Sequence, residues 1–178
     1  MLKIPYGKHF IDSEDIKSVV KALKYKSITQ GPLIEKFEKK VAKFVGSKYA
    51  IAVSSASAGL HLSLMALDIK KGHKVITSPV SFVSTSNSIL HCSAKPIFCD
   101  IDNKSLNLDL IKTKIKIDKK VKAIIQVHLG GAATSNIKFK KKLNDRGIKL
   151  IEDAAHSFGS KYECGSRVGS CKYSDLTI

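Results

Sequence analysis

The sequence has no run of apolar residues long enough to cross a membrane. A membrane-spanning helix needs about 20 consecutive apolar residues. The 178-residue chain has no such run, although 43% of its residues are hydrophobic. Its N-terminus, MLKIPYGKHF, also lacks the apolar core of a secretory signal peptide. The sequence therefore predicts a cytoplasmic protein without a membrane partner.

Acidic residues and arginine are both scarce. The chain has 31 Lys and Arg against 15 Asp and Glu, a formal net charge of +16, and Arg146 and Arg167 are its only arginines. Such a charge can attract nucleic acid. However, the lysines are spread through helical patterns, and no base-reading motif or alternation of aromatic and basic residues accompanies them. We therefore expect only weak, salt-sensitive association with nucleic acid, and no nucleic-acid partner.

The cysteines also lack the spacing of a zinc site. Cys92 and Cys99 are seven residues apart, as are Cys164 and Cys171, whereas paired ligands of structural zinc follow one another within about two to four residues. We therefore expect no metal site and, in a cytosolic chain, reduced thiols.

An N-terminal helical segment is predicted for residues 1–48. Asp12 or Ser13 can cap a first helix, which carries a helical stripe of apolar residues. Pro32 suits the first turn of a second helix that ends at Gly46.

From Tyr49 onward, short apolar strands alternate with helices. Strands are predicted at residues 49–53, 74–78, 95–102, 121–128, 148–153 and 173–178. Strands that are apolar on both faces and separated by helices are typical of a parallel sheet covered on both sides. The sequence therefore predicts an α/β fold, a three-layer sandwich around a mostly parallel sheet.

The stretch LIEDAAHSFGS, residues 150–160, is the most informative motif. Ligands of open α/β sheets bind beyond the carboxyl ends of the strands. Asp153 is placed there to meet a cationic ring nitrogen, and His156 can reach the same ligand. The alternative is a surface acid that caps the next helix.

Two further strand ends carry residues suited to a ligand. The small residues of SSASAG, residues 54–59, open a helix whose N-terminus can receive a phosphate, although such a serine cap can also be a plain helix start. Phe82 could stack on a flat ring or could be a core residue. His128 is expected to be structural rather than a metal ligand. A phosphate cradle, an aromatic platform and an Asp-x-x-His pair together fit pyridoxal phosphate.

The chain resembles the DegT/StrS family of nucleotide-sugar aminotransferases, which are pyridoxal phosphate enzymes. The resemblance lies in the ordered segments ITQGP, VSSASAGLHLSLMAL, TSPVSFVSTSNSI, VHLGG, IEDAAHSFGS and VGSCKYSDLTI. Within the family, the chain is most similar to the UDP-sugar 4-aminotransferases of pseudaminic acid biosynthesis. This implies transfer of the glutamate amino group to the C4 ketone of a UDP-4-keto-6-deoxy-N-acetylhexosamine.

The resemblance also implies roles for individual residues. Ala56 and Ser57 would bind the phosphate of pyridoxal 5'-phosphate or pyridoxamine 5'-phosphate. Phe82 would stack on the ring, Asp153 would pair with the ring nitrogen, and His156 would lie near the phenolic oxygen. Residues of the sugar-nucleotide site would be Tyr6, Lys26, Ser27, Ile28, Thr29 and Ser55.

Two departures from the family pattern set expectations of their own. The stretch AATSN after HLGG replaces a more usual Gln or Lys and a short acidic turn. The family's Schiff-base Lys lies in an FSF-x-x-x-K segment, expected beyond Ile178. Residues 49–178 would then form an incomplete cofactor-binding large domain without the C-terminal small domain. The full-length form would be a homodimer, and this chain would not sustain catalysis alone.

Two other functions stay open on the sequence. One is a non-catalytic module that binds pyridoxal phosphate or a sugar nucleotide. The other is a related sugar aminotransferase or a dehydratase, because dehydratases of the same family replace the Schiff-base Lys by His.

Overall fold

The computed structural model describes residues 7–134 and 137–178 of the chain. The body is built around a sheet of five strands in the order β2-β1-β3-β4-β5, with every neighbouring pair parallel. The strands are β1 (Lys74–Thr77), β2 (Lys95–Phe98), β3 (Val121–Val127), β4 (Lys149–Asp153) and β5 (Leu176–Thr177). The predicted parallel α/β fold is thus confirmed.

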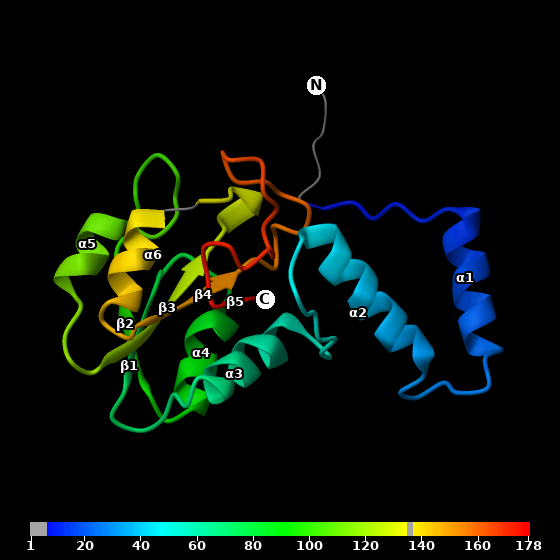
Figure 1. Cartoon of the computed structure of the whole chain (residues 1–178), viewed down its shortest axis with the longest axis horizontal. Helices are drawn as coiled ribbons and strands as arrows, with labels where there is room; N and C mark the ends of the chain where they lie inside the picture. Colours follow the sequence, from blue (N-terminus) through cyan, green and yellow to red (C-terminus); the bar gives the residue numbers. More distant parts are fainter. Residues whose placement is uncertain (1–6, 135–136) are drawn as a thin grey trace.

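Helices cover both faces of the sheet, which gives three layers (Figure 1). On one face, α3 (Ala56–Ala66) and α4 (Val83–His91) pack against alternate strand residues in a cluster that includes Leu64, Ile89 and Ile125. On the other face, α5 (Leu110–Ile115) and α6 (Ile137–Asn144) pack against the intervening strand residues, whose side chains point the opposite way. These residues form a second cluster that includes Ile124 and Leu143. Burial of both strand faces explains the continuous apolar runs in the sequence.

The predicted helical segment forms α1 (Ser13–Leu23) and α2 (Pro32–Val45), which extend to one side of the body (Figure 1). Asp12 caps α1 through the backbone N–H groups of Glu14 and Asp15. The C-terminal end of α2 packs on the body through Val45, whereas α1 contains no buried residue. No helix in the described part of the chain is long and apolar enough to span a bilayer.

The predicted strand at residues 49–53 is wrong. This segment has no strand assignment in the structure. Tyr49 and Ile51 are exposed, and the segment pairs with no strand among the described residues. An apolar run becomes a strand only where a neighbouring backbone completes its hydrogen bonds, and none does so here.

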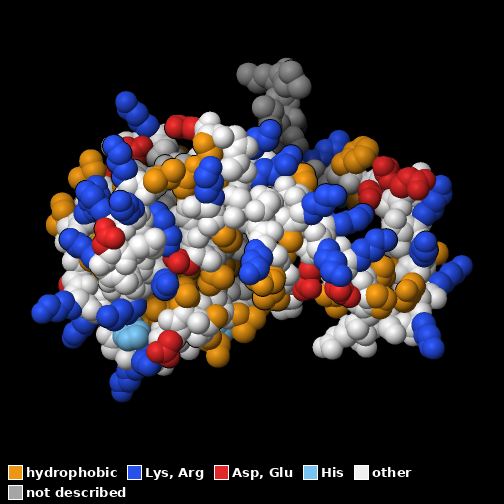
Figure 2. All heavy atoms as spheres, viewed as in Figure 1, with side chains coloured by type: hydrophobic (Ala, Val, Ile, Leu, Met, Phe, Trp, Pro, Cys, Tyr) orange, Lys and Arg blue, Asp and Glu red, His pale blue; other side chains and the backbone are white. Residues whose placement is uncertain are grey.

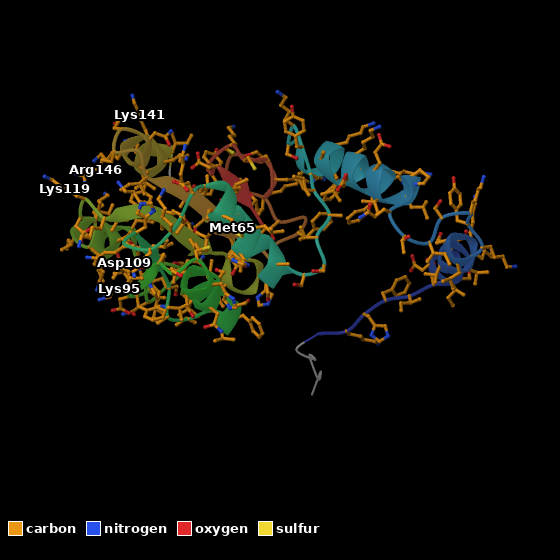
Figure 3. All side chains as sticks on the ribbon, turned by 90° about the horizontal axis from the view of Figure 1, so that it is seen from below. Met65, Lys95, Asp109, Lys119, Lys141 and Arg146 are labelled. Atoms are coloured by element: carbon orange, nitrogen blue, oxygen red, sulfur yellow. The ribbon has the colours of Figure 1, made fainter. Side chains whose placement is uncertain are left out.

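Lysines occupy the amino ends of three strands. β1, β2 and β4 each begin with a lysine: Lys74, Lys95 and Lys149. Lys95, Lys119 and Lys141 project from the end of the molecule opposite α1 (Figure 3), and basic side chains are scattered over the face seen in Figure 2. The carboxyl ends of the strands, where the sequence predicts the ligand, lie on the opposite side of the sheet from these amino ends. This side is called the carboxyl edge of the sheet below.

Candidate functional site

Asp153, the last residue of β4, is a buried carboxylate at the carboxyl edge of the sheet. Its Oδ2 accepts a 2.7 Å hydrogen bond from Thr85 Oγ1, in the first turn of α4. Its Oδ1 receives only a long 3.5 Å contact from the N–H of Ala155. Because an ionised carboxylate can accept about four hydrogen bonds, Asp153 keeps capacity for a further donor such as a protonated ring nitrogen.

Thr85 is itself supported by the loop that follows β1. Its hydroxyl lies 2.6 Å from Ser81 Oγ and is fully buried. The structure therefore joins the residues after β1 to the end of β4 through side chains.

Glu152, immediately before Asp153, is the centre of a buried polar cluster. Its Oε1 accepts hydrogen bonds from Tyr162 Oη (2.6 Å) and lies 3.1 Å from His128 Nε2. Its Oε2 accepts from Ser174 Oγ (2.7 Å) and Thr177 Oγ1 (3.0 Å). Burial acts to raise the pKa of Glu152, but the bonds from His128 and Tyr162 outweigh it and hold this pKa below its usual value.

His128 follows β3 and is completely buried beside Glu152 and Tyr162. The expectation of a structural histidine agrees with these contacts. Among the described residues, no group of three or more His, Cys, Asp or Glu side chains is arranged to hold a metal ion.

The N-terminus of α3 lies near the same edge. Ser55 caps the helix by accepting a 3.1 Å hydrogen bond from the N–H of Ala58, while Ala56 and Ser57 are exposed in the first turn. The first N–H groups of a helix have no acceptor within it and carry a partial positive charge. They can therefore receive a phosphate, with Ser57 Oγ as an additional donor.

A close contact between the backbone of α3 and a side chain joins this helix to Ile178, the residue that follows β5. A Cβ atom added to Gly59 would lie 3.0 Å from Ile178 Cγ2. Ile178 in turn bonds on both sides of Asp153, because its N–H donates to Glu152 O (2.9 Å) and its carbonyl accepts from Ala154 N–H (2.7 Å). Glycine at position 59 thus lets the first turns of α3 approach Ile178, which is itself hydrogen-bonded to the end of β4.

Phe82 and His156 are accessible at this edge. Phe82 is the N-cap of α4, one turn from Thr85, and is 72% exposed, which excludes the core alternative. His156 is exposed in the turn after β4, which is closed by a 2.7 Å bond from Ser157 N–H to Ala154 O. The structure therefore gathers residues 55–57, Phe82, Asp153 and His156 at one sheet edge.

The residues predicted to bind a sugar nucleotide are less closely grouped. Lys26, Ser27, Ile28 and Thr29 lie between α1 and α2, beyond the outer end of α2 in Figures 1 and 3. Only Ser55 of this set lies at the sheet edge, and Tyr6 lies outside the described residues. Their role in binding stays a prediction.

Two cavities in the described part of the chain lie away from the candidate site residues. One of about 370 Å³ is lined by α2 side chains such as Glu35 and Lys39. Another of about 570 Å³ lies between the end of α2 and the loop of Arg167 and Lys172. None of Ser57, Phe82, Asp153 and His156 lines either cavity. The predicted convergence of these residues on one concave site therefore stays a prediction.

A family profile matches almost the whole chain. Residues 9–177 match that of the DegT/DnrJ/EryC1/StrS aminotransferase family. The chain belongs to this family. It is 39% identical over 160 residues to the spore coat polysaccharide biosynthesis protein SpsC of Bacillus subtilis, with 90% of this chain and 41% of SpsC aligned.

Solved structures of aminotransferases share the fold. The PLP-form of Spr1654 from Streptococcus pneumoniae, a putative sugar aminotransferase, superposes with a TM-score of 0.89 at 26% identity, over 99% of this chain and 48% of that one. PseC of Helicobacter pylori, an aminotransferase involved in the biosynthesis of pseudoaminic acid, gives a TM-score of 0.85 at 30% identity, over 93% and 44%. The chain therefore spans less than half the length of these relatives.

Two residues that support the site, Thr85 and Glu152, are not singled out by the sequence motifs. Thr85 lies in a serine- and threonine-rich run with no feature that distinguishes it, and its contact with Asp153 depends on how α4 packs. Glu152 did carry a signal, because an acidic residue preceded by Leu150 and Ile151 occupies a position that the sheet buries. A buried acid requires partners, and His128 and Tyr162 supply them.

Proposed function

We propose that this chain forms the cofactor-binding part of a pyridoxal phosphate-dependent sugar aminotransferase. The observation that supports the proposal most is the buried Asp153 carboxylate at the end of β4, which is held on one oxygen by Thr85 and open to a donor on the other. Family membership and the likeness to PLP-form Spr1654 support the same cofactor. In this proposal residues 49–178 belong to the large domain, and residues 1–48 form a helical segment outside it.

The residues at the sheet edge fit the cofactor group by group. The N-terminus of α3, with Ser57, would hold the phosphate; Phe82 would lie against the ring; and the Asp153 carboxylate would hold a proton on the ring nitrogen. When bound, pyridoxal phosphate supplies an electron sink for transfer of an amino group. His156, exposed in the turn after Asp153, would donate to the ring's phenolic oxygen.

We further propose that the acceptor is a UDP-4-keto-6-deoxy-N-acetylhexosamine and the donor glutamate, as in pseudaminic acid biosynthesis. The structural likeness to PseC and the segment ITQGP support this choice. Lys26, Ser27, Ile28 and Thr29, together with Tyr6 and Ser55, would contact the sugar nucleotide. The structure leaves residues 26–29 exposed, so they are accessible to a ligand or to another subunit.

A homodimer is the assembly that we expect for the full-length form. The apolar stripe of α1 supports it, because Ile16, Val19 and Leu23 are each more than half exposed and α1 contains no buried residue. Apolar stripes of this kind are usually covered in the assembled protein.

Titration of the purified chain with pyridoxal phosphate and pyridoxamine phosphate, followed by absorbance and fluorescence, tests the cofactor proposal. We expect saturable binding that Asp153→Asn weakens at least tenfold, because the amide cannot hold the ring nitrogen proton as an ion pair. Asp145→Asn, an exposed position on the turn after α6, is the matched control, since it changes net charge equally. Equal affinities for the two variants would overturn the assignment of Asp153.

A further inference from the structure

The four hydrogen bonds that converge on Glu152 connect the same strand ends that present Asp153. His128 follows β3, Thr177 belongs to β5, and Tyr162 and Ser174 come from the segment between β4 and β5. Glu152 itself is 1% exposed. One carboxylate thus holds three neighbouring strands and the intervening loop in register at the edge where the cofactor is proposed to bind.

The network also fixes the backbone of Asp153 on both sides. The N–H of His128 donates to Asp153 O (3.0 Å), and Ser157 Oγ donates to His128 O (3.2 Å). On the other side, Ile178 bonds to Glu152 and Ala154. A shift of His128 or of β5 would therefore rotate the peptide that carries the Asp153 side chain.

Both oxygens of Glu152 have to act as acceptors in this arrangement. Tyr162 Oη and His128 Nε2 meet Oε1, whereas Ser174 and Thr177 meet Oε2. An ionised carboxylate can accept from all four partners, whereas a protonated one would carry an O–H that has to donate to one of them. Burial acts to raise the pKa of Glu152, yet the bonds from its partners bring it below its usual value, which is consistent with an ionised group.

From this geometry we infer that Glu152 is a positioning residue. Its ionised carboxylate holds the ends of β3, β4 and β5 together by hydrogen bonds and thereby orients the Asp153 carboxylate toward its ligand. The inference rests on the proposed function where it concerns the cofactor. Glu152 acts through Asp153, because its own oxygens are occupied by protein donors and are buried.

The first experiment compares the pyridoxal phosphate affinity of Glu152→Gln and Glu152→Ala with that of the unchanged chain. The amide of the Gln side chain keeps one acceptor, and the Ser174 and Thr177 hydroxyls, 3.2 Å apart, can turn to accept from it. The Ala side chain cannot accept a hydrogen bond from any of these four partners. We expect the dissociation constant to rise about three- to tenfold for Gln and more than tenfold for Ala, with a changed absorption spectrum of bound cofactor because the ring nitrogen proton is less firmly held.

Leu143→Ala is the matched control for general destabilisation. Leu143 is 1% exposed and packs in the cluster beneath α6, on the sheet face opposite α4. At a temperature where all variants are folded, we expect its affinity to stay within twofold of the unchanged chain. If Leu143→Ala weakens binding as much as Glu152→Ala, Glu152 contributes only stability and the inference is wrong.

A second measurement does not depend on the cofactor. The ¹³Cγ resonance of Asp153 and the hydrogen exchange of the His128 amide report directly on the strand end. We expect Glu152→Gln to shift the resonance and to accelerate the exchange at least tenfold, and Leu143→Ala to leave the resonance in place. An unshifted Asp153 resonance in Glu152→Gln would overturn the inference even if the cofactor binds. Failure of the unchanged chain to bind pyridoxal phosphate would instead contradict the proposed function alone.

Discussion

Thr85 Oγ1 donates a 2.7 Å hydrogen bond to Asp153 Oδ2, and the two residues are 68 positions apart in the sequence. Both side chains are buried, and the bond joins α4 to the end of β4. A buried carboxylate needs donors to offset the loss of hydration. The bond from Thr85 therefore restricts rotation of the Asp153 carboxyl group and leaves Oδ1 as the oxygen with capacity for a further donor.

Replacement of Thr85 by Val removes this donor and keeps the shape of the side chain. We expect Thr85→Val to lower the free energy of unfolding by about 1–3 kcal/mol, because the buried Asp153 carboxyl group loses a hydrogen-bond donor. Urea denaturation measures this loss. Ser86→Ala is a suitable control, since the hydrogen bond that the Ser86 hydroxyl makes among the described residues is to Val83 O within α4. Similar losses for the two variants would contradict a special role for Thr85.

The sheet and its covering helices were predictable because their pattern is local. Runs such as VKAIIQV alternate between the two apolar clusters, and Asp12, Pro32 and Gly46 mark helix ends by their own chemistry. The parallel arrangement follows from the alternation of strands with helices. These features depend on residues that are neighbours in the sequence.

Features that depend on distant partners were not predictable in the same way. Residues 49–53 have the composition of a strand, but a strand requires a partner, and the described part of the chain provides none. The motif around Asp153 indicated a ligand site, whereas the contact with Thr85 depends on the packing of α4. Side-chain alternation in β4 places Glu152 and Asp153 on opposite faces of the sheet. The motif alone does not show that Glu152 meets His128 and Tyr162, because these partners come from other segments.

The hydrogen bonds to Glu152 make the free energy of unfolding depend on pH in the acidic range. The pKa of Glu152 in the folded chain lies below its ordinary value of 4.5. The ionised network therefore stabilises the fold fully above about pH 4.5, and this contribution is lost as the pH falls through the lower folded-state pKa. We expect the stability difference between the unchanged chain and Glu152→Gln to be largest at neutral pH and to shrink below about pH 4.5. Urea unfolding at a series of pH values measures it; a difference independent of pH would contradict an ionised Glu152.

We expect Cys164 to react faster than Cys92 with reagents that modify thiols. Hydrogen bonds from Ser166 and Tyr173, with Lys172 nearby, lower the pKa of the exposed Cys164 thiol to about 7. Burial instead raises the pKa of Cys92. Because the thiolate is the nucleophile, iodoacetamide at pH 7 should modify Cys164 well before Cys92, as peptide mass spectrometry can measure.

Alkylation of the variant Ser166→Ala tests the cause of this reactivity, with Cys92 in the same chain as the internal reference. Loss of the Ser166 hydroxyl removes the largest cause of the lowered pKa of Cys164. The pH at which alkylation reaches half its maximal rate should therefore rise, while the rate at Cys92 stays unchanged. Equal rates at Cys92 and Cys164 in the unchanged chain would show that the hydrogen bonds do not activate this thiol.

Gly169 makes a close contact with Val45, at the end of α2 that packs on the body. A Cβ atom at this position would lie 3.1 Å from both Cβ and Cγ1 of Val45, and the backbone has φ +92°. Nearby, Arg167 Nη1 donates to Phe44 O (3.2 Å) and its guanidinium lies over the Phe44 ring. A side chain at position 169 would therefore be strained by its own backbone and would also push against α2.

Gly165 allows these two effects to be separated. It has a similar φ of +82°, but a Cβ atom there would meet nothing within 4 Å. We expect Gly165→Ala to cost about 1–2 kcal/mol of stability through backbone strain alone. Gly169→Ala should cost more, and it should also accelerate hydrogen exchange at the Gly46 amide, which bonds to Ala42 O at the end of α2. Thermal denaturation gives the first comparison and hydrogen exchange the second. Equal losses of stability with unchanged exchange at Gly46 would mean that α2 does not depend on the close approach of Val45 to Gly169.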